Sequence, residues 1–115
     1  MASGAGPGGC GAKHPTTWKA EDVELGVSCR KHSAKATFNL DNLNSLGCLK
    51  GLDVMLTYSN RTLGEQRTPL TNLNSKEFEF SDLESGSKYN FCLIFMADID
   101  GHHGYVTGFC KVSVE

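Results

Sequence analysis

The sequence predicts an all-β domain, with about seven strands packed as a sandwich of two antiparallel sheets. From Trp18 onward, short runs of alternating apolar residues are separated by clusters of Asn, Asp, Gly and Ser at fairly regular intervals. No window of about 11 residues or more keeps a 3.6-residue apolar period, so no substantial helix is expected. Strands with one apolar face bury that face most simply by packing two sheets together.

Six runs carry the strand pattern. They span residues 23–27, 36–40, 52–58, 77–81, 89–96 and 105–114. Within 52–58 the aliphatic residues share one face while Asp53, Met55 and Thr57 point the other way, which predicts a half-buried strand. The run 89–96 provides the fullest core face, and the last run is expected to keep Val112 and Val114 in its core phase. Residues 60–76 are interpreted as a turn followed by a polar connection.

The chain is long enough for one domain and too short for two, at 115 residues. Residues 1–17 are rich in Gly and Pro and are expected to form a flexible leader, with the sandwich over 18–115. The formal net charge of −2 argues against nucleic acid as a partner. The longest apolar run, 91–97, is too short to cross a bilayer, so the segment itself is not expected to contact a membrane.

A leucine, two serines and a tyrosine stand at alternate positions before the fullest apolar strand: Leu83, Ser85, Ser87 and Tyr89. This spacing resembles the fibronectin type III signature, in which Leu, Pro, Thr and Tyr alternate, and here the serines replace Pro and Thr. The resemblance covers roughly residues 19–115 and implies an immunoglobulin-like sandwich. It also implies that Tyr89 is a tyrosine corner, whose hydroxyl returns to a nearby backbone group, with Leu83 beside it.

The match departs from the family in the second strand, where a tryptophan is expected. Phe38 or Leu40 occupies that position, and Trp18 lies too early in the chain to replace it. The pattern therefore also fits other immunoglobulin-like sandwiches, because these share an architecture without sequence similarity.

Five cysteines indicate an oxidising compartment for a domain of this size. Cys10 lies in the leader and is interpreted as the unpaired one, which leaves three connectivities for Cys29, Cys48, Cys92 and Cys110. Cys92 and Cys110 flank the last hairpin, so a bridge between them fits neighbouring strands. Their side chains are expected on opposite faces, however, so a bulge or another pairing would be needed. Buried free thiols are the alternative, and the spacing does not favour a zinc site.

Asn60, Arg61 and Thr62 form an N-glycosylation sequon in a turn, which agrees with a secreted protein. The segment 97–105 is expected to be a loop that holds Asp98, Asp100, His102 and His103. Loops on rigid sandwiches commonly carry recognition, and the resemblance implies a ligand-contacting loop here. A solvated hairpin loop is the simpler interpretation, and a divalent metal site at these carboxylates and imidazoles is the less favoured one.

No residue set forms an identifiable nucleophile and activating base, so the chain is not expected to be an enzyme or to need a cofactor. The sequence predicts a noncatalytic extracellular module of a cell-surface receptor or adhesion protein. It would recognise a protein ligand or act as a spacer beside neighbouring receptor domains. The alternatives are a secreted single-domain ligand-binding protein and an intracellular structural scaffold with reduced cysteines.

Overall fold

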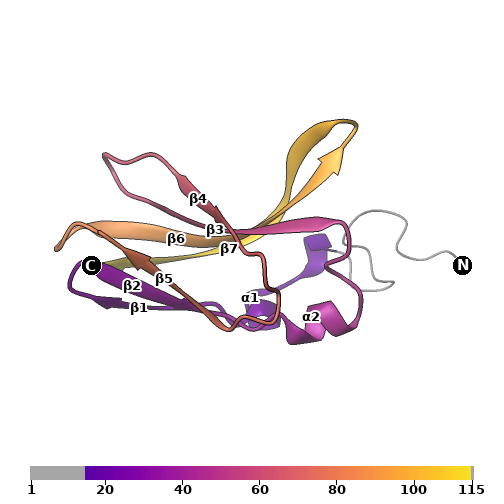
Figure 1. Ribbon diagram of the computed structural model, residues 1–115, viewed down its shortest axis with the longest axis horizontal. Helices are drawn as coiled ribbons and strands as arrows, with labels where there is room; N and C mark the ends of the chain where they lie inside the picture. Colours follow the sequence, from indigo (N-terminus) through magenta and orange to yellow (C-terminus); the bar gives the residue numbers. More distant parts are fainter. Residues whose placement is uncertain (1–14, 115) are drawn as a thin grey trace, which may run out of the picture.

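Two antiparallel sheets face each other in the computed structural model, which describes residues 15–114 (Figure 1). One sheet has the order β1-β2-β5 and the other the order β4-β3-β6-β7. The strands are β1 Gly26–Arg30, β2 Ser33–Thr37, β3 Leu52–Ser59, β4 Gln66–Pro69, β5 Glu77–Ser81, β6 Lys88–Ile99 and β7 His102–Val114. The described residues also form three short helical turns: η1 Pro15–Thr17, α1 Ala20–Val23 and α2 Asp41–Ser45. The predicted all-β sandwich is confirmed.

The core lies between the two sheets and is filled by the alternating residues of β3 and β6. Leu56 pairs in register with Leu93, and Val54 pairs with Phe95. All four side chains are buried, together with Phe91 of β6 and Phe80 of β5. Each fully buried side chain of this kind contributes about 1.5 to 3 kcal/mol through loss of apolar surface from water. The alternation read from the sequence in these strands therefore sets the inner face of the larger sheet.

The amino-terminal strand begins later than the sequence predicts. Val23 ends the helical turn α1, and β1 starts only at Gly26, so the predicted strand over 23–27 is wrong in its first half. The Lys19 backbone N–H donates to the Asp22 carboxylate at 2.7 Å, which favours a helical turn at this point. Glu24 then takes a left-handed conformation with φ of 50° and ends the turn.

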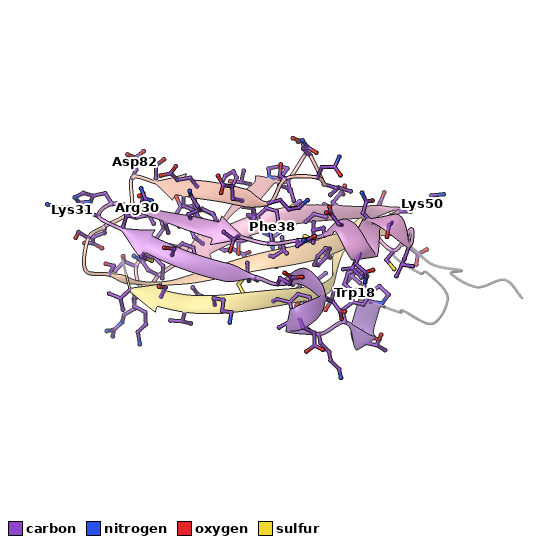
Figure 2. The ribbon with its side chains drawn as sticks, turned by 90° about the horizontal axis from the view of Figure 1, so that it is seen from below. Trp18, Arg30, Lys31, Phe38, Lys50 and Asp82 are labelled. Carbon is purple, nitrogen blue, oxygen red and sulfur yellow. A yellow bond between two sulfur atoms is a disulfide. The ribbon has the colours of Figure 1, made fainter. Side chains whose placement is uncertain are left out.

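Aromatic residues outside the strands complete the core. Trp18 precedes α1, is buried, and packs edge-on against Phe95 with ring centroids 5.1 Å apart. Figure 2 places Trp18 at the end of the sandwich opposite Lys31 and Asp82. Phe38 follows β2, which ends at Thr37, and is also buried. Residues 1–14 of the predicted leader lie outside the described residues, whereas Pro15 is a buried part of η1.

The polar connection predicted for 60–76 contains one additional strand. β4 pairs with β3 through Met55 and Pro69, Leu56 and Thr68, Thr57 and Arg67, and Tyr58 and Gln66. Its side chains are exposed or half-buried because β4 is the edge of its sheet. A polar edge strand with a proline carries little apolar alternation, so the sequence pattern does not reveal it.

The last strand presents the opposite face to the one predicted. Phe109 lies opposite Leu93 and packs against the core, whereas Val112 and Val114 are 62% and 57% exposed. The change follows from a register shift beside Phe95 and Met96, where Val106 is the extra residue of β7. The prediction that Val112 and Val114 are core residues is therefore wrong.

Candidate recognition surface

The segment predicted as a loop is the tip of the β6–β7 hairpin. Asp98 pairs with His103, and Ile99 pairs with His102, so the strands continue to a turn of only Asp100 and Gly101. Both turn residues have positive φ, 51° and 80°, which is the geometry of a two-residue type I′ turn. The loop over 97–105 is thus corrected to a tight hairpin, which rises away from the other strands in Figure 1.

The four predicted contact residues are all exposed at this tip. His103 also reaches across the sheet, where its Nε2 atom lies 2.7 Å from the Asp53 carboxylate of β3. Asp98 and His102 stand beside the turn on the two paired strands. The hairpin therefore presents carboxylates and imidazoles together and is tied to the body of the sheet through Asp53.

A groove of about 540 Å³ lies next to this hairpin contact. Asp53 and Met55 of β3 form one side, and Pro69, Leu70 and Leu73 from β4 and the segment after it form the other. The Leu70 backbone N–H donates to the Val54 carbonyl at 2.8 Å and holds the two sides together. The tip and the groove share Asp53, so they make one continuous surface.

A second apolar cluster covers the outer face of the larger sheet. Cys92, Ile94 and Met96 of β6 are buried there against Met55. The Arg67 guanidinium lies over this cluster, with Nη1 3.5 Å from the Met96 sulfur. On β7, the Tyr105 hydroxyl lies over Gly108, where a Cβ atom would be only 3.0 Å from it. The sequence placed Asp53 and Met55 on this face but could not show which side chains cover it.

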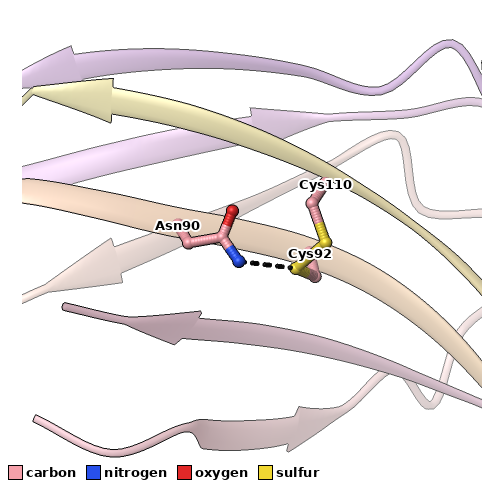
Figure 3. The surroundings of a disulfide bond; sticks show 3 residues. All are labelled: Asn90, Cys92 and Cys110. Carbon is pink, nitrogen blue, oxygen red and sulfur yellow. Dashed lines mark hydrogen bonds between the residues drawn. A yellow bond between two sulfur atoms is a disulfide. The ribbon is translucent and has the colours of Figure 1, made fainter. Parts of the chain in front are cut away.

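A disulfide joins Cys92 of β6 to Cys110 of β7 with an S–S distance of 2.05 Å (Figure 3). The two residues are direct partners in the register, with Cα atoms 4.1 Å apart. Both side chains lie on the outer face because the extra residue Val106 shifts the phase of β7, so the bulge that the sequence required for this bridge is present. The Asn90 side-chain amide donates to the Cys92 sulfur at 3.3 Å.

Cys48 and Cys29 differ in their bonding state. Cys48 is fully buried after α2 and is disulfide-bonded. Cys29 of β1 is a half-buried free thiol whose sulfur lies 3.2 Å from the Ser113 hydroxyl. The structure therefore leaves Cys29 unbridged, and its sulfur donates a hydrogen bond to a hydroxyl of β7 instead. The prediction for Cys10 falls outside the described residues.

The Asn60 sequon stands directly after β3 in a turn with an exposed surface. The Asn60 side-chain oxygen accepts hydrogen bonds from the backbone N–H groups of Thr62 and Leu63, at 3.1 and 2.6 Å, and from the Thr62 hydroxyl at 3.3 Å. The exposed part of the sequon is Arg61 and Thr62, beside the half-buried Asn60.

Tyr89 lies at the corner between β5 and β6. Its hydroxyl accepts a hydrogen bond from the Glu84 backbone N–H at 2.8 Å, and the Leu83 side chain is buried beside it. The Leu83 backbone also pairs with His32 of the β1–β2 turn: the Leu83 N–H donates to the His32 carbonyl at 3.0 Å, and His32 Nδ1 donates to the Leu83 carbonyl at 2.9 Å. The corner thereby fixes one end of both sheets.

Within residues 15–114, no group of three or more His, Cys, Asp or Glu side chains is placed to hold a metal ion. No helix in that range is long and apolar enough to span a membrane.

Comparisons with known proteins give matches in structure only. No family model matches the chain, and no curated protein matches it. A fibronectin type III domain of the human collagen alpha-1(XX) chain superimposes with a TM-score of 0.52 at 16% identity, over 99% of this chain and 87% of that one. A computationally redesigned β-sandwich protein aligns with a TM-score of 0.49 at 11% identity, over 78% of this chain and 89% of the other. The chain has a fibronectin type III-like fold, as the spacing from Leu83 to Tyr89 indicated.

Proposed function

We propose that this domain is a noncatalytic recognition module of an extracellular or cell-surface protein. The observation that supports the proposal most is the Cys92–Cys110 bridge within a fibronectin type III-like fold. Disulfides persist in oxidising compartments and are rare in the cytosol. The bridge thus favours an extracellular location over an intracellular scaffold with reduced cysteines.

The proposed contact surface is the tip of the β6–β7 hairpin together with the groove beside Asp53. Most of its residues stand on paired strands, which hold them in place more firmly than a long loop would. The exposed carboxylates of Asp98 and Asp100 and the imidazoles of His102 and His103 offer hydrogen bonds, and the groove adds Met55, Pro69 and Leu70. A polar tip beside an apolar groove suits a protein ligand, because protein interfaces combine an apolar core with a polar rim.

The test is a binding screen with the domain displayed as a multimer against a library of cell-surface and secreted proteins. Any ligand found is then titrated against the triple variant D100A/H102A/H103A. We expect the affinity to fall at least tenfold, while the melting temperature falls only slightly: all three side chains are exposed, but Asp100 holds a positive φ and His103 contacts Asp53.

Lys31→Ala is the matched control, since Lys31 is exposed in the β1–β2 turn at the end opposite α1 and Trp18 (Figure 2). It should leave the affinity unchanged. Equal affinity of the triple variant and the unmodified domain would contradict the assignment of the tip. Failure to bind any protein in the library would favour a spacer role.

A further inference from the structure

β7 is the longest edge strand of the sandwich. It lies at the end of the order β4-β3-β6-β7 and spans 13 residues, whereas the edge strands β1, β4 and β5 have five, four and five. β1 approaches β7 from the inner face, where Cys29 contacts Ser113. Figure 2 shows β7, in pale yellow, along one border of the ribbon, with no strand beyond it toward Val114. In the described chain no strand pairs with its outer backbone edge, although the turn η1 also contacts β7.

The disulfide identifies which backbone groups face this open edge. In an antiparallel pair, directly opposite residues with Cα atoms near 4.5 Å are those that do not hydrogen-bond to each other. The Cα atoms of Cys92 and Cys110 are 4.1 Å apart. The N–H and C=O groups of Cys110 thus point away from β6, and by alternation those of Gly108, Val112 and Val114 do so as well.

β7 also carries exposed apolar side chains, and its last eight residues carry little charge. Three of the large exposed hydrophobic residues of the described chain lie on β7, namely Tyr105, Val112 and Val114. Between Thr107 and Val114 the only charged residue is Lys111. Proteins usually protect an open edge with several charges, a proline or a very short strand. β4 follows that pattern with Pro69 and Arg67, and this part of β7 does not.

We propose that β7 pairs antiparallel with β7 of a second copy of this chain, so that two sandwiches share one continuous sheet. Pairing about a two-fold axis at Cys110 brings Gly108 opposite Val112 of the partner subunit, and both residues then exchange their edge hydrogen bonds. Val112 would lie beside the partner's Gly108, which has no Cβ atom, and next to the Tyr105 ring that covers that glycine.

Charge favours this register over its neighbour. About Cys110, each Lys111 lies opposite the partner's Phe109. A two-fold axis one residue further along the strand would place the two Lys111 side chains directly opposite each other, and like charges in that position are destabilising. In the register about Cys110 the strand matches a second copy of itself in its edge donors and acceptors and in its exposed apolar side chains.

The first test is sedimentation velocity from about 10 µM to about 1 mM, the range of weak self-association. The protein carries Cys29→Ser, so that a disulfide between free thiols does not contribute. We expect the mass to rise from that of one chain toward that of two. Val112→Glu should abolish the rise, and Leu46→Glu, at an exposed leucine outside β7, should leave it intact. A constant monomer mass, or a dimer that Val112→Glu does not weaken, would overturn the proposal.

The second test is backbone hydrogen exchange of the same protein at both concentrations. The amides of Cys110 and Val112 should exchange several-fold more slowly in the dimer, because only there do they have hydrogen-bond acceptors. Those of Phe109 and Lys111, already bonded to β6, should not change. Equal exchange of Cys110 and Val112 at both concentrations would also overturn the proposal, whether or not the substituted proteins fold.

Discussion

The Tyr89 hydroxyl accepts a hydrogen bond from the backbone N–H of Glu84 at 2.8 Å, and this contact closes the corner between β5 and β6. Both Tyr89 and the neighbouring Leu83 are buried, and the hydrogen bond to Glu84 is partly buried. The corner therefore stabilises the connection between the two sheets as well as the strand that follows it.

Tyr89→Phe should lower the free energy of unfolding by about 0.5 to 1.5 kcal/mol, the usual contribution of one hydrogen bond. Tyr105→Phe is the matched control, because Tyr105 is exposed on β7 and should change stability by less than about 0.5 kcal/mol. Urea denaturation of the three proteins measures both effects. An unchanged midpoint for Tyr89→Phe would show that the corner hydrogen bond does not stabilise the fold.

Replacing both Cys92 and Cys110 by alanine should lower the free energy of unfolding by about 3 kcal/mol, since the bridge closes a loop of 18 residues. Cys29→Ala should cost only about 1 kcal/mol or less, because Cys29 is a half-buried free thiol. Thermal unfolding of unreduced protein compares the two variants. A double variant as stable as the parent would mean that the bridge does not constrain the unfolded chain.

Trp18→Ala should destabilise the domain by about 3 kcal/mol or more, the usual cost of removing a buried aromatic ring. Trp18 packs against Phe95 of β6, an inner strand of the larger sheet. Leu46→Ala provides the control, because Leu46 is 54% exposed and should change stability by less than about 0.5 kcal/mol. Similar midpoints in urea for both variants would place Trp18 outside the core.

Asn60 should carry one N-linked glycan when the domain passes through the secretory pathway of a eukaryotic cell, because its turn exposes Arg61 and Thr62. Intact mass before and after enzymatic deglycosylation measures the occupancy. Asn60→Gln and Thr62→Ala should each abolish the glycan, whereas Asn72→Gln, outside any sequon, should not. A secreted protein with no mass change on deglycosylation would contradict this prediction.

The strands that face the core on one side could be predicted from the sequence. β3, β5 and β6 alternate clearly because one side of each is buried between the sheets. The Leu83-to-Tyr89 spacing also identified the fold, because its residues are fixed by a specific corner geometry. These features depend on local patterns, which a single sequence contains.

Other features depend on contacts that local patterns do not record. The phase of β7 changes at Val106, and nothing in the apolar pattern marks that extra residue. Trp18 reaches Phe95 only because η1 and α1 lie against the end of the sandwich. At the candidate surface, the sequence identified the exposed tip residues. The contact of His103 with Asp53 could not be predicted, because it depends on β3 lying beside β6.

The most direct test of the extracellular assignment is the redox state of the cysteines in protein taken from the cells that make it. Free thiols are alkylated at lysis, and the disulfide-linked peptides are then identified by mass spectrometry. We predict that the peptides containing Cys92 and Cys110 are found linked and that Cys29 is alkylated. Alkylation of Cys92 and Cys110 as free thiols would contradict the extracellular assignment and favour an intracellular scaffold with the same fold.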